Sequence, residues 1–360
     1  MRLKVTDEQL EEGIHRYCRD LTYLARQGRF DPITGRDQEI LDSILILLQK
    51  GRKNVMYLAP AGVGKTALCI GLAQKIVNDQ VPDYLKGARL LEIDLPSMAA
   101  GTSGPAEFQE RFMPIVKGVA ERYHMPDKYP KYILFMDEIH TIMPSCHGSA
   151  YAGLSEVMKP YLTVGDLHVI GATTREEYRI YFEIDEAADR RFQKIYLDVP
   201  TVDETHNILE ALKFGYEKHH KIRIPSDLNH AICNLTQEHM RKRNQPDKSI
   251  IVMDGACAMH VLEHGTGGEL SLDAVLYFMS TEVNVHPTAF LDNRQDQELR
   301  EAATARSEKG EASYPYEREV KDDRGNTDYL KMGHKVKKPT RKNVQTFNQS
   351  DEEMHDSKGD

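Results

Sequence analysis

The sequence predicts an α/β fold with a parallel sheet, followed by a smaller helical domain, and three observations support this class. Short runs that are almost wholly apolar, such as KYILFMDE at 131–138, have the composition of strands buried on both faces. Helical patterns alternate with these runs, as in the βα units that build parallel sheets. Beyond about residue 202 the apolar runs stop, and amphipathic helical patterns replace them.

Two helices are expected before the first strand. The first covers residues 6–27, because TDEQ at its start has the pattern of a capping box and apolar residues recur at the helical period. These residues are Leu10, Ile14, Tyr17, Leu21 and Leu24. The segment 28–37, GRFDPITGRD, contains two glycines and a proline and ends this helix. The second helix is expected over 38–50.

The remaining elements follow the alternation of strand and helix. Strands are expected at 54–59, 89–95, 131–138, 167–174 and 194–200, with a helix at 65–77 after the first of them. Amphipathic helices are then expected at 203–220, 226–242 and 248–265. Residues 289–360 are polar, with a basic stretch KMGHKVKKPTRK and an acidic end DEEMHDSKGD, so this tail is expected to be mostly disordered.

Composition excludes several classes of protein. The chain has 360 residues and a net charge of −9, so binding to the phosphate backbone of nucleic acids is not the default expectation. Its five cysteines are widely spaced and match neither a zinc site nor a disulfide framework. The N-terminus lacks an apolar export segment, and the run ILILL is too short to cross a membrane. We therefore expect a soluble, cytoplasmic protein without membrane partners.

The segment APAGVGKT at 59–66 matches the phosphate-loop motif. It lies between a predicted strand and a predicted helix, the context that separates this motif from a chance glycine-rich turn. Lys65 is expected to reach the β- and γ-phosphates of ATP, and Thr66 to ligate Mg²⁺. The rest of the loop would surround the phosphates with backbone N–H groups; these residues are Ala59, Pro60, Ala61, Gly62, Val63 and Gly64. Ala59 departs from the motif, which has glycine there, and would be strained only at positive φ.

Two acidic residues complete the expected catalytic set. Asp137 and Glu138 end an apolar strand at the edge where parallel sheets bind ligands. Asp137 is expected to hold Mg²⁺, and Glu138 to activate the attacking water. The sequence GATT places Thr173 and Thr174 level with these acids, either as donors to the γ-phosphate or as ordinary strand residues.

The pair Arg190 and Arg191 has two interpretations from the sequence alone. Either both are solvated surface charges, or they act as arginine fingers on the γ-phosphate in a neighbouring subunit.

In order along the chain, these motifs resemble the first ATPase module of the Clp-type AAA+ unfoldases and disaggregases. The resemblance covers about residues 17–262 and includes GVGKT, ILFMDEIHT, GATTREEYR, RRFQKIYLDVP and NQPDKSI. It implies an AAA+ P-loop NTPase core with a helical lid, and ATP hydrolysis at the subunit interfaces of a ring, expected to be a hexamer. The implied division is an N-terminal helical segment (1–30), a nucleotide-binding domain (31–201), a lid domain (202–288) and the tail (289–360).

The resemblance also assigns residues. Thr174 falls at the sensor position, and Arg190 and Arg191 match the trans-acting fingers. Pro32 and Ile33 fall where the family's backbone brackets adenine, followed by Thr34 where an aliphatic residue is usual. The lid motif near the nucleotide is matched by Pro246, Asp247 and Lys248.

One segment departs from the family. The loop before EFQER (107–111) corresponds to the family's pore loop, where an aromatic residue grips a polypeptide, but the grip positions here are Ser103, Gly104 and Pro105. Glycine offers no contact area, so threading by this loop is not expected. Tyr151 is either a substitute for that aromatic residue or, more simply, packed locally. Only about sixteen residues precede the match, and the tail has no second phosphate loop, so a single-module relative is expected.

Three functions remain open from the sequence. The first is an ATPase that remodels a protein assembly without long-range threading. The second is a DNA-linked motor or loader, in which the basic stretch of the tail contacts phosphates through Lys335, Lys337, Lys338, Arg341 and Lys342. The third is a scaffold gated by nucleotide that hydrolyses slowly. The protein client cannot be named from the sequence.

Overall fold

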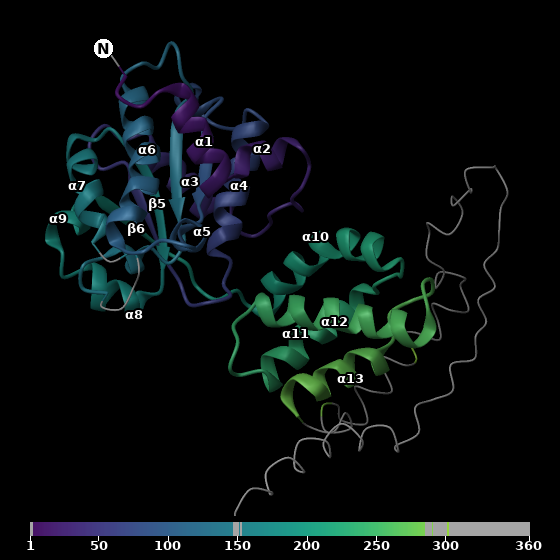
Figure 1. The fold of residues 1–360 in the computed structure, drawn as a ribbon. Helices are drawn as coiled ribbons and strands as arrows, with labels where there is room; N and C mark the ends of the chain where they lie inside the picture. The colour runs from purple at the N-terminus through teal and green to yellow at the C-terminus, as the bar shows by residue number, and fades with distance from the viewer. Residues whose placement is uncertain (1–2, 147–150, 152, 285–289, 291–300, 302–360) are drawn as a thin grey trace, which may run out of the picture.

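The computed structural model describes residues 3–146, 151, 153–284, 290 and 301, and these form an α/β domain followed by a group of helices (Figure 1). The sheet has the order β1-β3-β4-β5-β2-β6. Its strands are β1 (Cys18–Asp20), β2 (Asn54–Leu58), β3 (Arg89–Ile93), β4 (Tyr132–Met136), β5 (His168–Thr173) and β6 (Phe192–Tyr196). All neighbours pair in parallel except β1, which is antiparallel to β3. The predicted α/β class with a parallel sheet is confirmed.

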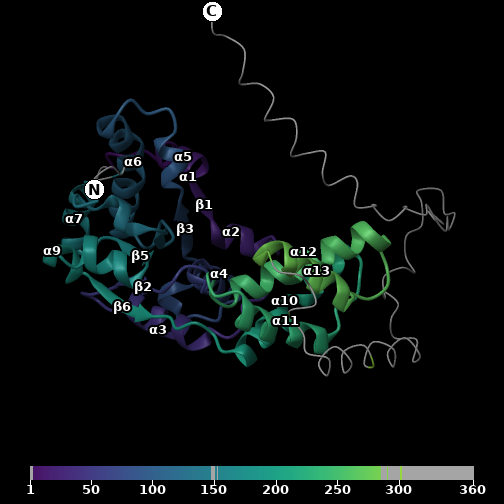
Figure 2. The ribbon, with the colours of Figure 1, turned by 90° about the horizontal axis from the view of Figure 1, so that it is seen from below.

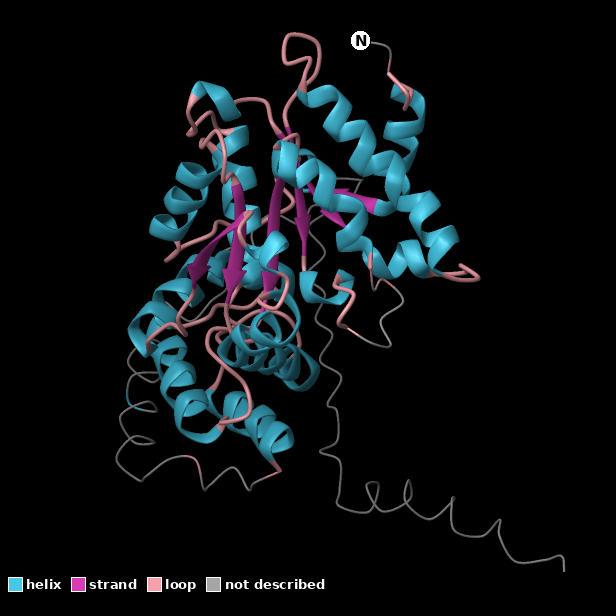
Figure 3. Cartoon of the chain, turned by 90° about the vertical axis from the view of Figure 1, so that its left-hand side faces the viewer, coloured by secondary structure: helices cyan, strands magenta, loops and turns pink. Residues whose placement is uncertain are grey.

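Helices cover both faces of this sheet (Figure 3). The helices of the α/β domain are α1 (Asp7–Tyr17), α2 (Leu21–Arg26), α3 (Asp37–Leu47), α4 (Lys65–Val77), α5 (Leu95–Ala99), α6 (Pro105–Tyr123), α7 (Leu154–Val164), α8 (Arg175–Glu177) and α9 (Glu186–Asp189). Along β2, Met56 and Leu58 enter the core shared with α1, α6 and α7, while Val55 and Tyr57 enter the core shared with α3 and α4. Burial on both faces explains why the strands are continuous apolar runs.

The helix expected over residues 6–27 is interrupted, so that prediction was wrong at its centre. Cys18–Asp20 is extended and pairs with β3, and Asp20 then caps α2 by accepting from the N–H of Tyr23 at 2.9 Å. This pairing supplies hydrogen-bond partners to the edge of β3, and such long-range pairing is invisible to helical periodicity.

The second domain consists of α10 (Val202–His220), α11 (Ser226–His239), α12 (Asp247–His264) and α13 (Leu272–Val283), grouped together in Figure 2. Three of these helices were expected, whereas α13 was missed. The helices share their own apolar core, which Phe290 also enters. The tail expected from 289 otherwise lies outside the described residues, apart from Glu301. Among the described helices, none combines the length and apolarity needed to span a membrane.

Candidate nucleotide site

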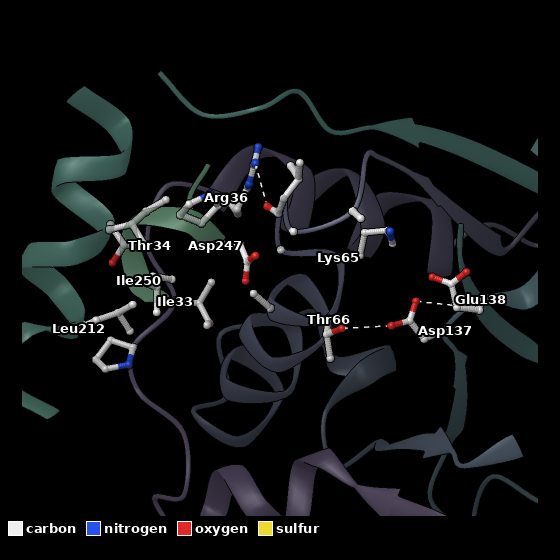
Figure 4. Close-up of a pocket in the computed structure, with 18 residues that line it drawn as sticks. Ile33, Thr34, Arg36, Lys65, Thr66, Asp137, Glu138, Leu212, Asp247 and Ile250 are labelled. Carbon is white, nitrogen blue, oxygen red and sulfur yellow. Dashed lines mark hydrogen bonds between the residues drawn. The ribbon is translucent and has the colours of Figure 1, made fainter. Parts of the chain in front are cut away.

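A cavity of about 450 Å³ lies at the carboxyl ends of the parallel strands, between the α/β domain and the helical domain (Figure 4). Its two ends differ in chemistry. One end is lined by the apolar residues Pro32, Ile33, Ile208, Leu212 and Ile250. The other end holds Lys65, Thr66, Asp137 and Glu138. An elongated ligand with an apolar ring system and an anionic tail fits this division.

Two glycines shape the phosphate loop, and each has a physical requirement for glycine. Gly62 has φ of 77°, and a Cβ there would lie 2.9 Å from the Cβ of Asp247 in α12. Gly64 has φ of 101° and directly precedes the first residue of α4. Left-handed backbone at these positions disfavours any other residue. The N-terminus of α4 therefore opens into the cavity, where its N–H groups suit an anion.

Lys65 and Thr66 stand at the start of α4. The Lys65 side chain is buried, and its ammonium donates to the carbonyl oxygen of Ala59 at 3.4 Å. The Thr66 hydroxyl donates to Oδ2 of Asp137 at 3.4 Å. Thr66 and Asp137 thus offer adjacent hard oxygen ligands, which are the kind that Mg²⁺ prefers. The residues present fit this metal.

Glu138 follows β4 in the left-handed region, with φ of 50° and ψ of 42°. Such a backbone is uncommon for residues with a side chain and is often held at functional sites. Burial raises the pKa of Glu138, and the neighbouring carboxylates of Glu177 and Asp137 raise it further. Glu138 and Asp137 also line a second cavity of about 500 Å³, together with Arg19, Glu92 and Asp94.

Ala59 and Pro60 are not among the residues that line the cavity. Ala59 is fully buried and does not adopt positive φ, so its methyl group causes no backbone strain. Its N–H donates to the carbonyl oxygen of Thr173 at 3.2 Å, which joins the start of the loop to β5. Ala59 therefore supports the loop, and the expected contact with phosphate falls to Ala61, Gly62, Val63 and Gly64.

The apolar end of the cavity contains residues that sequence reasoning missed. Pro32 and Ile33 were expected there, and Thr34 also lines the cavity. Ile208 and Leu212 lie four residues apart on α10, and Ile250 lies on α12. Their helical spacing signals only an apolar face, which is equally typical of the lid core. Arg36 was missed as well; its guanidinium donates to the carbonyl oxygens of Val63 and Asp198.

The lid motif is divided between two environments. Asp247 lines the cavity beside Gly62, and Asn244 donates to the carbonyl oxygen of Ala61 at 3.0 Å. Lys248, which was expected at the nucleotide, does not belong to this lining. Its ammonium is buried within the helical domain and donates to the carbonyl oxygen of Met240 at 3.2 Å. Burial lowers the pKa of Lys248.

The Thr174 hydroxyl, expected at the sensor position, has its hydrogen-bond partners on Glu177. It caps α8 by accepting from the N–H of Glu177 at 3.2 Å and donates to Oε2 of Glu177 at 2.8 Å. Thr174 is not part of the cavity lining. Thr173 is fully buried on β5 and points its hydroxyl toward His140 at 2.8 Å.

Arg190 and Arg191 lie at the opposite end of the sheet from the phosphate loop. They precede β6, and Phe192 at its start pairs with Asn54 at the start of β2. The loop follows the other end of β2, about 16 Å away for five residues of strand. Arg190 is largely exposed and pairs with Glu186 at 2.6 Å. Neither arginine is placed to reach a nucleotide in the same chain.

The pore-loop segment connects α5 to α6. The guanidinium of Arg111 donates to the carbonyl oxygens of Met98 and Ala100, and the Ser103 N–H donates to Glu107 at 2.8 Å. These contacts fix the base of the loop. Tyr151 packs against Phe108 with ring centroids 5.3 Å apart, which supports local packing over a substitute grip.

Comparison with known protein families agrees with the two domains. Residues 55–198 match the ATPase family associated with various cellular activities (AAA), and residues 201–309 match the AAA lid domain. The chain is 40% identical over 263 residues to the chaperone protein ClpB of Gloeobacter violaceus, covering 72% of this chain and 30% of that protein. It is 42% identical over 265 residues to the chaperone protein ClpB 1 of Synechococcus elongatus, covering 72% and 29%.

Solved structures give the same assignment. The Saccharomyces cerevisiae Hsp104–casein complex in its extended conformation aligns with a TM-score of 0.66 and 34% identity, covering 75% of this chain and 45% of that one. The Hsp104–ADP complex aligns with a TM-score of 0.68 and 31% identity, covering 82% and 49%. The chain thus spans about 30% of the length of the curated relatives it matches. It belongs to the AAA ATPase family, as an AAA domain with its lid that is homologous to a module of the ClpB chaperones.

Proposed function

We propose that this chain binds ATP with Mg²⁺ and hydrolyses it. The observation that carries the proposal is the cavity beneath the lid, which joins an apolar end to a phosphate loop and two adjacent acids. The relatives named for chaperone activity and the Hsp104–ADP structure support the same ligand class. Pro32, Ile33 and Leu212 would contact the adenine, while Gly62 and Gly64 let the backbone approach the phosphates.

Each polar residue at the other end has a role in this proposal. Lys65 binds the β- and γ-phosphates, and the N-terminus of α4 adds its positive dipole end. Thr66 and Asp137 would hold Mg²⁺, which supplies neutralising charge to the phosphates when bound. Glu138 orients the attacking water and accepts its proton, which requires the carboxylate form.

A second copy of the chain would complete the site. Arg190 and Arg191 lie too far from the phosphate loop of their own chain, so we assign them to a neighbour's γ-phosphate in a ring, proposed to be a hexamer. The second cavity beside Glu138 supports this assignment. Arg19 pairs with Glu92 there, and the further carboxylates of Asp94, Asp137 and Glu138 leave the lining with a charge that suits another guanidinium. A ring arranged this way couples hydrolysis in one subunit to contact with the next.

The work done by the ring is proposed to be the remodelling of a protein assembly. This proposal follows from homology to ClpB chaperones and likeness to an Hsp104–casein complex. The grip positions Ser103 and Gly104 lack an aromatic side chain, so the action would not depend on threading by that loop.

The test is ATP turnover of the purified protein against protein concentration, with oligomer size followed by light scattering. Turnover per subunit should rise as the oligomer assembles, and Glu138→Gln should bind ATP while hydrolysing little. Turnover in Glu138→Gln equal to that of the unaltered protein would remove Glu138 as the base. Tight ATP binding without turnover at any concentration would instead favour a nucleotide-gated scaffold.

A further inference from the structure

His140 lies close to the proposed catalytic acid, with Nδ1 3.5 Å from Oε2 of Glu138. It belongs to the short 3₁₀ turn Ile139–Ile142 that follows Glu138, and it is 8% exposed. Its ring stacks on Tyr181, with centroids 5.6 Å apart and planes at 22°. Burial lowers the pKa of His140, so the imidazole is neutral near pH 7 and carries one N–H.

A chain of hydrogen bonds fixes where that proton resides. The Thr173 hydroxyl lies 3.0 Å from Oε2 of Glu177 and 2.8 Å from Nδ1 of His140. The carboxylate of Glu177 can only accept, so the single hydroxyl proton of Thr173 is donated to it. Thr173 must then accept from His140, which places the imidazole proton on Nδ1.

Glu177 is held as a carboxylate by its other contacts. Burial raises its pKa, but hydrogen bonds from the hydroxyl and N–H of Thr174 and from Thr173 lower it below the usual value. Oε2 of Glu177 accepts from the Thr174 N–H at 3.0 Å and from its hydroxyl at 2.8 Å. The acceptor that orders the chain of hydrogen bonds is therefore itself anchored to the start of α8.

The same imidazole nitrogen faces the catalytic acid. Nδ1 of His140 lies 3.5 Å from Oε2 of Glu138, at the limit of hydrogen-bond reach. Because the Nδ1–H points to Thr173, a small rotation of the half-exposed Glu138 side chain would let Oε2 share that proton in a three-centre hydrogen bond. No such donor to Glu138 would exist if the proton were on Nε2.

We propose that His140 is a positioning residue for Glu138: its Nδ1–H, kept on that nitrogen by Thr173 and Glu177, is shared between Thr173 and the Glu138 carboxylate and holds that carboxylate toward the attacking water. The inference rests on the proposed ATPase function and deepens it. It also connects β5 and α8, through Thr173 and Glu177, to the acid that follows β4. A carboxylate that lacks this donor samples unproductive orientations, so the chemical step slows while nucleotide binding is retained.

Three substitutions of His140 separate the Nδ1–H from the bulk of the ring. His140→Asn carries an N–H near the position of Nδ1, whereas His140→Gln carries one near Nε2. His140→Phe keeps the stacking on Tyr181 but has no N–H. We expect kcat to fall about tenfold or more in His140→Phe and His140→Gln, with Kd for ATP changed less than about twofold. His140→Asn should recover most of kcat.

Two further variants test whether loss of packing, rather than loss of the N–H, explains a lower kcat. Tyr181→Leu removes the stacked ring but leaves the hydrogen-bond chain, so its kcat should stay near that of the unaltered protein. Thr173→Val removes, with little change in volume, the hydroxyl that keeps the imidazole proton on Nδ1, so it should lower kcat as His140→Phe does. If a His140 variant fails to fold, Thr173→Val provides the test in its place. Thermal unfolding of each variant provides the comparison of stability.

The inference is overturned if His140→Phe keeps normal kcat, or if the Phe, Gln and Asn variants lose kcat equally. A loss in Tyr181→Leu as large as in His140→Phe would also overturn it, because packing alone would then explain the effect. Glu138→Gln, measured alongside, separates a failure of the proposed ATPase function from a failure of the positioning role. Normal turnover in Glu138→Gln would refute the proposed function itself, whereas an inactive Glu138→Gln with normal His140→Phe refutes only the positioning role.

Discussion

Lys65 is the residue on which nucleotide binding depends most directly. It is buried at the start of α4, and its hydrogen bond within the described part of the chain is a long one to the carbonyl oxygen of Ala59, so its ammonium is available to phosphate oxygens. Lys65→Ala should raise the Kd for ATP by about tenfold to a hundredfold, as expected for loss of a charge-assisted hydrogen bond. Titration calorimetry checks this.

Lys75 on the same helix is the matched control for Lys65. It pairs with Asp37 at 3.0 Å and does not line the cavity. Lys75→Ala should leave the Kd for ATP unchanged, so equal losses in the two variants would contradict a specific role for Lys65.

Ala59 shows how a departure from a motif is resolved by backbone conformation. From the sequence, alanine at this position would strain the backbone at positive φ and would be tolerated at negative φ. Ala59 does not adopt positive φ, so its backbone is unstrained. Ala59→Gly should lower the free energy of unfolding by about 1 kcal/mol, through added chain entropy and a lost buried methyl group. It should not raise ATP turnover. Urea unfolding with parallel turnover assays checks both; a gain in turnover would indicate that alanine slows catalysis.

Among the elements, α4 shows how packing between helices sets the adenine end of the cavity. A Cβ added at Gly71 would lie 2.6 Å from Cδ1 of Ile40 and 3.3 Å from Cγ2 of Ile33. Gly71→Ala therefore gains helix propensity of about 1 kcal/mol, but it must displace the Ile40 side chain and it also presses on Ile33. The Kd for ATP should rise several-fold. An unchanged Kd would contradict the coupling of this helix contact to the apolar end of the cavity.

The loop between α5 and α6 accommodates an added side chain, which makes its function testable. Gly104 has extended backbone, with φ of 164°, and nothing lies within 4 Å of an added Cβ. Gly104→Tyr should fold normally and should create or raise the unfolding of a tagged protein if only the grip is missing. Gly51→Tyr is the control, since Gly51 is equally open and precedes β2 at the far end of the sheet. No gain over Gly51→Tyr would indicate that more than the grip differs.

Elements were predictable from the sequence where local pattern and tertiary burial agree. The strands at β2, β4 and β5 are apolar because helices cover both faces, and α4 was predicted with the bounds that the structure has. Cys18–Asp20 was not, because its extended conformation depends on pairing with β3, more than seventy residues away. The segment of α13 was not identified either, although Ser271 caps it.

At the scale of the whole molecule, the site combines segments that are distant in sequence. The motif residues Lys65, Thr66, Asp137 and Glu138 were predictable because their chemistry fixes their spacing from strand ends. The lid contribution of Leu212 and Ile250 was not, since only the folded chain brings those helix faces to the cavity. The placement of Lys248 was not predictable either: its neighbour Asp247 lines the cavity, whereas the Lys248 ammonium donates to Met240 within the helical domain.

The most direct measurement of the central claim, that a second copy completes the site, is a mixing experiment. A Lys65→Ala chain retains its arginines but should bind ATP weakly, and an Arg190→Ala/Arg191→Ala chain should bind ATP without a functional finger. Each should hydrolyse ATP poorly alone, and their mixture should recover turnover through interfaces where one supplies the nucleotide and the other the arginine. Turnover in the mixture no greater than the sum of the separate chains, with mixed oligomers present, would contradict the account.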